Sequence, residues 1–180
     1  MTPDFRLETK RLTLRPVSPA DRPDLVALEA DAEVMRYLNG GRPVPEAGLP
    51  DGDFLTPRGT EPEVLAAHET ATSRFIGWFA FFDDGGPDGA RTAEIGYRLT
   101  RNSWGRGLAS EGVTALVSQA FDYWGFACIR AETMAANTGS RRVMEKAGMR
   151  HVETIRPNFP EPIPGSEAGE VIYEIRKSRT

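Results

Sequence analysis

Apolar side chains recur along this chain with two different periods. From 105 to 124 they return every three or four positions, the spacing of one face of an amphipathic helix, at Leu108, Val113, Leu116, Val117, Ala120, Phe121 and Trp124. Similar spacing predicts helices from about 19 to 32, at 33–38 and at 138–147. Alternating or short apolar runs predict strands at 11–15, 64–70, 75–82, 91–99, 128–134, 150–156 and 170–176.

The order of these elements predicts an α/β fold. We expect one domain over residues 1–180, in which a strongly twisted, mixed sheet of about seven strands is flanked by about four helices on both faces. Two stretches, 39–63 and 157–164, are rich in Gly or Pro and are predicted to be irregular. A structureless connection as long as the first is usually either functional or disordered.

A glycine-rich turn carries the clearest chemical signal. The segment from Asn102 to Gly112 follows the strand at 91–99 and opens the helix at 105–124. Gly105 and Gly107 let the backbone approach a ligand closely. The first N–H groups of a helix have no internal partner, and they lie at the positive end of its dipole. The turn is therefore a candidate seat for a pyrophosphate, with a plain strand-to-helix turn as the alternative.

A second segment, from Asn137 to Met149, is typical of a capped helix that follows the strand at 128–134. The two segments read Asn102-x-x-Gly105-x-Gly107 and Asn137-x-x-Ser140-x-x-Val143-Met144-Glu145-Lys146-x-Gly148-Met149. In this order and separation they resemble the two acyl-CoA-binding motifs of the GNAT N-acetyltransferase superfamily. Near the start of the chain, Leu7 to Pro16, Asp21 and Ala32 to Leu38 resemble the branch that acetylates the N-termini of ribosomal proteins. The similarity runs from about Leu7 to Ile175.

The resemblance implies a GNAT-like fold and an acyltransferase. Such an enzyme moves an acetyl group from acetyl-CoA to a primary amine by direct attack in a ternary complex. The amine is the N-terminus of a peptide or protein in part of this branch and a different amine in many other members. The sequence does not specify which acceptor this chain uses, and it leaves a homodimer open.

The resemblance also implies which residues hold acetyl-CoA. Backbone amides of the turn would bind the pyrophosphate beside Arg106, for which a solvated arginine is the alternative. The end of the strand at 91–99 would pair with the pantetheine arm, and an N–H near Leu99 would polarise the thioester carbonyl. Asn137 would bond the same arm, cap its helix, or do both. The implied cofactor-binding residues are Tyr97, Arg98, Leu99, Trp104, Gly105, Arg106, Gly107, Leu108, Ala109, Ser110, Asn137 and Ser140.

Glu94 and Ser140 are the predicted catalytic residues. Glu94 sits in an otherwise apolar strand, where loss of solvent raises the pKa of a carboxyl group and makes it a better base. A glutamate that faces solvent or pairs with an arginine is the alternative. Many family members carry a tyrosine seven residues after the second motif's Asn, and here that position is Met144, which has no proton to give. Ser140 would contact the CoA sulfur instead, so the identity of the general acid stays open.

Fold analogy places Met35, Tyr37 and Phe159 in the acceptor slot. Acceptor specificity would come from residues 33–63 and 157–169, which carry no motif.

Composition narrows the partners and the compartment. The net charge of −4 argues against nucleic acid as a partner and is compatible with a cationic amine. Cys128, the one cysteine, cannot form an internal disulfide and is expected to be buried, which fits a reducing cytoplasm. No N-terminal signal pattern appears, and the longest apolar run, 75–82, is far too short to span a membrane. His68 and His151 lie on different predicted strands, so we expect no metal site.

Two other classes of function compete with the enzyme. A catalytically idle acyl-CoA-binding or sensing module is favoured slightly by Met144, while Glu94 and Ser140 argue against it. A dinucleotide-binding fingerprint would need a third glycine where this chain has Ser110, and its turn would follow the first strand.

Overall fold

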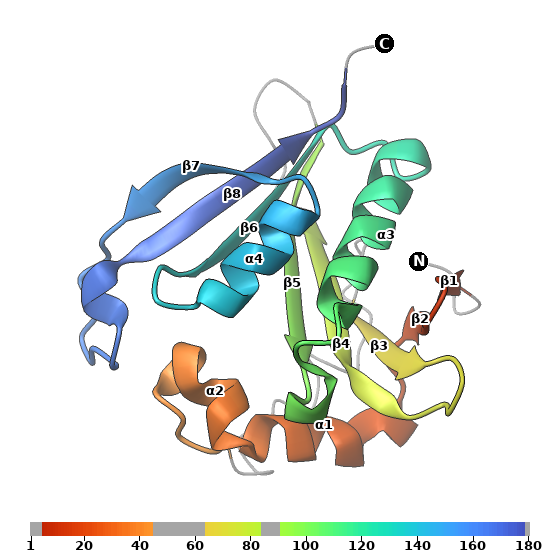
Figure 1. Cartoon of the computed structure of the whole chain (residues 1–180), viewed down its shortest axis with the longest axis horizontal. Helices are drawn as coiled ribbons and strands as arrows, with labels where there is room; N and C mark the ends of the chain where they lie inside the picture. Colours follow the sequence, from red (N-terminus) through yellow and green to blue (C-terminus); the bar gives the residue numbers. More distant parts are fainter. Residues whose placement is uncertain (1–4, 45–63, 84–90, 179–180) are drawn as a thin grey trace.

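A twisted, eight-stranded sheet forms the centre of the molecule, and helices lie on both of its faces (Figure 1). This computed structural model describes residues 5–44, 64–83 and 91–178, so most of the Gly/Pro-rich stretch at 39–63 lies outside the described residues. Within those ranges the strands are β1 (Leu7–Glu8), β2 (Leu12–Pro16), β3 (Val64–Glu69), β4 (Phe75–Asp83), β5 (Thr92–Leu99), β6 (Cys128–Met134), β7 (Arg150–Ile155) and β8 (Glu170–Arg176). The helices are α1 (Arg22–Ala30), α2 (Ala32–Asn39), α3 (Leu108–Asp122) and α4 (Thr138–Lys146). The predicted α/β fold is confirmed, with β1 as an additional strand too short to show an alternating pattern.

The sheet has the strand order β1-β2-β3-β4-β5-β6-β8-β7. Its neighbours are antiparallel except for β5 and β6, which run parallel and pair at only three positions, from Thr92 with Cys128 to Glu94 with Arg130. By contrast, β4 stays paired with β5 as far as Leu99, and β8 stays paired with β6 as far as Met134. In Figure 1 the two parallel strands run apart toward their carboxyl ends. A gap in the ladder therefore opens beside residues 95–99 in the middle of the sheet.

Apolar side chains fill the space between the sheet and the helices on each face. The larger cluster joins α3 and α4 to one face, and includes Phe79, Phe81, Ile95, Leu108, Leu116, Ile129, Met144 and Tyr173. The smaller cluster joins α1 and the start of α2 to the other face, through Leu25, Leu28, Val34, Ala66, Phe75, Trp78 and Ala80. Successive residues of β3 and β4 alternate between the two clusters, as the period of a strand requires.

Helix α3 shows how local sequence sets an element's bounds. The predicted apolar face is confirmed, since Leu108, Val113, Leu116, Val117 and Ala120 are all buried. The helix begins three residues later than predicted because the turn before it is not helical: Gly105 and Gly107 have φ values of 70° and 77°. Those left-handed conformations are easy for glycine and strained for other residues.

Gly112 of α3 lies directly against the ring of Phe79 on β4. A β-carbon at this position would come within 2.3 Å of Phe79 Cζ, which leaves no room for a methyl group. We expect Gly112→Ala to lower the free energy of unfolding by about 1–3 kcal/mol, as overpacking of a core does. Urea denaturation measures this change. Gly139→Ala in α4 is the matched control, because its β-carbon would meet Asn137 Oδ1 at an ordinary 3.6 Å. An unchanged urea midpoint for Gly112→Ala would contradict the packing.

Candidate active site

The N-terminus of α3 carries three backbone amides that lie ahead of the first helical hydrogen bond. Gly107 is its N-cap residue, and no side chain makes a capping hydrogen bond there among the described residues. The amides of Leu108, Ala109 and Ser110 precede the first helical bond, which runs from Glu111 N to Gly107 O at 3.1 Å. By contrast, α2 and α4 are capped by the side chains of their own N-cap residues. The turn that the sequence singled out thus presents uncovered donors at the positive end of a helix.

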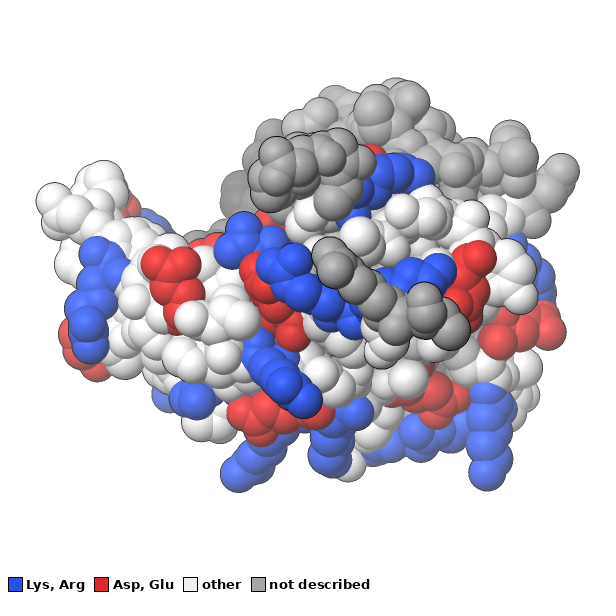
Figure 2. Space-filling view, turned by 90° about the horizontal axis from the view of Figure 1, so that it is seen from above, with Lys and Arg blue, Asp and Glu red and all other residues white. Residues whose placement is uncertain are grey.

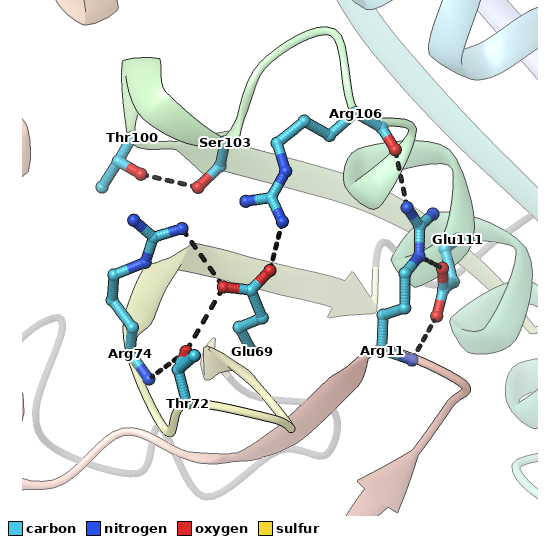
Figure 3. Close-up of polar contacts among 8 residues, drawn as sticks. All are labelled: Arg11, Glu69, Thr72, Arg74, Thr100, Ser103, Arg106 and Glu111. Carbon is cyan, nitrogen blue, oxygen red and sulfur yellow. Dashed lines mark hydrogen bonds and ion pairs between the residues drawn. The ribbon is translucent and has the colours of Figure 1, made fainter.

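Arg106 of this turn is held by a carboxylate at the end of β3 (Figure 3). Its guanidinium forms an ion pair with Glu69, the last residue of β3, and Arg74 bonds the same carboxylate at 3.1 Å. The hydrogen bond from Arg106 is the main cause that lowers the pKa of Glu69. The positive charge of Arg106 is therefore partnered by Glu69, and a bound phosphate would compete with Glu69 for it.

Arg11 fixes the turn to the start of the chain (Figure 3). Its Nε lies 2.6 Å from Glu111 Oε2, and its Nη1 donates to the backbone oxygen of Arg106 at 2.8 Å. Thr9 Oγ1 also bonds Glu111, at 2.6 Å. Burial tends to raise the pKa of Glu111, but the hydrogen bonds from Thr9 and Arg11 outweigh it, so the pKa is lowered. Sequence patterns missed this cluster because its members lie on two segments about 100 residues apart.

Tyr97 and Ser140 face each other across the gap between β5 and β6. The Tyr97 hydroxyl lies 2.8 Å from Ser140 Oγ and 3.2 Å from Ser140 O. Burial raises the pKa of Tyr97 to about 12, although the hydrogen bond with Ser140 works in the opposite direction. Asn137 caps α4, because its Oδ1 accepts the Ser140 amide at 3.1 Å. The capping role predicted for Asn137 is confirmed.

Met144 lies in the core and not at a position from which a side chain could protonate the CoA thiolate. It is only 1% exposed and belongs to the apolar cluster under α4. One helical turn separates Met144 from Ser140, yet Met144 lies in the core and Ser140 is half-buried.

Glu94 lies at the last position of β5 that pairs with β6, where its partner is Arg130. Its side chain is exposed, so the desolvated setting expected from the apolar strand is not found. The reason is alternation: Ile95, Tyr97 and Leu99 take the face covered by α3 and α4, and Glu94 takes the opposite face. Glu94 and Ser140 thus stand on opposite faces of the sheet at the point where the strands separate.

The end of β5 is tied to the turn and to α1. Trp104 is 47% exposed, and its indole N–H donates to the Leu99 carbonyl at 2.8 Å. Arg98 points to the opposite face, where it pairs with Glu29 of α1 and lies 5.2 Å over the Trp78 ring. Any contact of Arg98 with a cofactor would therefore come from its backbone.

Two segments predicted to form the acceptor slot come together. Arg42, just after α2, forms an ion pair of 3.2 Å with Glu161 in the proline-rich loop. Met35 of α2 is buried, whereas Tyr37 of α2 and Phe159 of the loop are half-buried. In Figure 1 this end of the molecule, beside α2, lies below the carboxyl end of β6.

A pair of carboxyl groups on the face of the sheet that carries Glu94 was missed by the sequence analysis. Glu132 of β6 and Glu170 of β8 share a hydrogen bond. Burial raises the pKa of Glu170 to about 7, and this bond and the charge of Glu132 act in the same direction.

A pKa raised in the folded state means that stability falls as pH rises from about 4.5 to about 7. We expect Glu170→Gln to remove this loss and to raise Tm at pH 8 relative to the wild type. Solvent screening at a half-buried site limits the gain to about 2–4 °C.

Melting both proteins at pH 4 and pH 8 measures this effect. The difference in Tm between variant and wild type should be larger at pH 8. An equal difference at both pH values would show that Glu170 titrates normally.

Charges of both signs are mixed over the surface seen in Figure 2, without a continuous basic face.

Among residues 5–44, 64–83 and 91–178, no group of three or more His, Cys, Asp or Glu side chains could hold a metal ion. His68 lies 3.8 Å from Asp21, and His151 lies 3.0 Å from the Thr154 hydroxyl. Cys128 is buried, as predicted. Within the same ranges no helix has the length and apolar character to cross a membrane.

Comparison with known proteins gives a consistent picture. A family profile for the acetyltransferase (GNAT) domain matches residues 11–150. The FsC-acetyl coenzyme A-N(2)-transacetylase of Aspergillus fumigatus is 35% identical over 193 aligned positions, which cover 95% of this chain and 76% of that protein. A GNAT acetyltransferase structure from Bacillus anthracis superposes with a TM-score of 0.77 at 24% identity, covering 96% of this chain and 98% of the other. RimL, a ribosomal alpha-N-protein acetyltransferase solved with coenzyme A, gives a TM-score of 0.76 at 15% identity, with coverages of 96% and 98%. The chain therefore belongs to the GNAT family and is an acyl-CoA-dependent N-acetyltransferase.

Proposed function

We propose that this protein transfers the acetyl group of acetyl-CoA to a primary amine, on a small molecule or a peptide N-terminus, by direct attack in a ternary complex. The observation that carries the proposal is that two candidate binding features lie next to each other. The uncovered N-terminus of α3 lies beside the gap where β5 leaves β6. One can take the phosphates of a CoA ester, and the other can take its pantetheine arm.

Binding of acetyl-CoA would use groups that the fold has already positioned. The amides of residues 108–110 would accept the pyrophosphate, and Arg106 would exchange Glu69 for a phosphate oxygen. The backbone of β5 beyond Glu94 would pair with the amides of the arm. The amide nitrogen of Asn137 would add a contact, since its Oδ1 is used as the helix cap.

The reaction requires a neutral amine and a stabilised leaving group. Glu94, whose side chain is exposed, accepts the proton that the neutral amine nitrogen loses as it attacks, directly or through water. The nitrogen attacks the thioester carbon, and the N–H near Leu99 stabilises the negative oxygen that forms. The new C–N bond remains while the C–S bond breaks, and the sulfur departs as a thiolate. Ser140, on the opposite face, donates a hydrogen bond to that thiolate and water restores its proton.

The acceptor side favours a positively charged amine. Glu94, Glu132 and Glu170 lie on the face of the sheet opposite α3 and α4. The relative from Aspergillus fumigatus is named for acetyl transfer to a nitrogen, which supports an amine acceptor here as well.

Release of CoA thiol in the presence of amines tests the proposal. Purified protein is mixed with acetyl-CoA and a panel of peptide N-termini, polyamines, aminoglycosides and amino acids, and thiol release is compared with an amine-free control. We expect amine-dependent release for at least one class. Tight acetyl-CoA binding without release for any amine would instead identify an idle acyl-CoA-binding module.

A further inference from the structure

The Tyr97 hydroxyl contacts two oxygen atoms of Ser140. It lies 2.8 Å from the Ser140 hydroxyl oxygen and 3.2 Å from the Ser140 carbonyl oxygen. Tyr97 comes from the part of β5 that does not pair with β6, and Ser140 comes from the first turn of α4. The contact therefore bridges the gap in which the thioester would lie, and it rests on the side of the sheet opposite Glu94.

A phenol has only one proton to share between these two acceptors. When Tyr97 donates to the Ser140 carbonyl, its oxygen is left to accept the serine proton, and the serine hydroxyl points at Tyr97. When Tyr97 donates to Ser140 Oγ, the serine proton is released and can point toward a third group. Chained hydrogen bonds polarise one another, so in this second arrangement Ser140 is also the better donor.

Tyr97 is poorly suited to give its proton away. Burial raises its pKa to about 12, well above that of a free thiol at roughly 8.5, so transfer of the proton to a departing thiolate is uphill. The phenol therefore stays neutral through the reaction and acts by holding its neighbour.

We propose that Tyr97 is a positioning residue that, when the CoA sulfur arrives, donates to Ser140 Oγ and so directs the serine hydroxyl at the sulfur. The proposal rests on the function proposed above. It assigns a role to the side chain of Tyr97, a residue of which only the backbone was expected to contact the cofactor. The net reaction is unchanged: Tyr97 keeps its proton, and Ser140 donates a hydrogen bond to the thiolate formed when the C–S bond breaks.

Three variants test this role: Tyr97→Phe, Ser140→Ala and the double variant. Phe keeps the ring that packs 6.1 Å from Phe79 and removes only the hydroxyl. We expect Tyr97→Phe to lower kcat about 10-fold, the scale of one hydrogen bond to a group that gains charge, with the KM for acetyl-CoA nearly unchanged. The double variant should be no slower than Ser140→Ala, because Tyr97 acts only through the serine.

Tyr173→Phe is the matched control. Tyr173 also links a strand to α4 by its hydroxyl, which donates to Glu145 at 3.0 Å and accepts from Arg141 at 3.2 Å, but it does not touch Ser140. Loss of that phenol should leave kcat as it is. Equal losses of kcat in Tyr97→Phe and Tyr173→Phe, or multiplied losses in the double variant, would overturn the proposal.

A second measurement does not depend on turnover. The apparent pKa of the thiol of bound CoA is followed by thiolate absorbance in each protein. We expect the wild type and Tyr173→Phe to lower it, and Tyr97→Phe and Ser140→Ala to return it toward the value of free CoA. If no amine is acetylated, the proposed function fails but this titration still decides the role of Tyr97. An identical thiol pKa in Tyr97→Phe and wild type would refute it.

Discussion

Replacing Glu94 with Gln is expected to lower kcat by about 10²–10⁴-fold, the usual contribution of a general base. Gln keeps the size and polarity of the side chain but cannot accept the amine's proton. Because Glu94 lies on the face of the sheet opposite α3, away from the N-terminus of that helix, acetyl-CoA affinity should change little. The fall of kcat/KM toward low pH in the wild type should also disappear in the variant.

Steady-state kinetics across pH, together with calorimetric binding of acetyl-CoA, measure these effects. Glu153→Gln is the matched control, since Glu153 is an exposed glutamate on β7. A Glu94→Gln enzyme with near-normal kcat and the same pH profile would show that the amine arrives neutral or that another group is the base.

Gly107→Tyr is expected to weaken acetyl-CoA binding by at least about 100-fold, the loss of one or two charge-assisted hydrogen bonds to phosphate. Gly107 is the N-cap residue of α3, so a side chain there stands over the amides that would take the pyrophosphate. It would also approach the Arg11 guanidinium, which lies 3.6 Å from the position of a β-carbon.

The left-handed backbone of Gly107 complicates this test, because any side chain strains it. Gly125→Tyr is the control for that strain: Gly125 has φ of 72°, no neighbour within 4 Å of a β-carbon, and lies beyond the other end of α3. Both variants should lose similar stability, and only Gly107→Tyr should lose affinity. Equal affinity in the two folded variants would exclude the α3 N-terminus as the phosphate site.

The parts of this fold that sequence reasoning could predict are those with a local signal. The apolar face of α3, the glycines before it and the Asn137 cap are each encoded within a few consecutive residues. The order of such elements then limits the number of folds that can bury them. Two glycines also fixed the start of α3, although the period of its apolar face did not mark where the left-handed turn ends.

The parts that sequence reasoning missed are pairings between distant residues. Arg11 meets Glu111 across 100 positions of the chain, and Tyr97 meets Ser140 across 43. No periodicity records which side chain lies opposite another after folding. The setting of Glu94 was misjudged for a related reason: an apolar strand has two faces, and only the packing of the helices decides which face is covered.

The short parallel pairing of β5 with β6 also has a mechanical meaning. Three paired positions join two blocks, β1–β5 and β6–β8, whereas seven join β4 to β5 and seven join β6 to β8. Among the strands from β2 to β8, this seam has the fewest paired positions. The amides of the pantetheine arm of acetyl-CoA would pair with β5 and so link the two blocks while the cofactor is bound. A ligand that binds only the folded state stabilises that state. The protein should therefore be stiffest while loaded and loosest after its product leaves, so that each turnover closes and reopens the same seam.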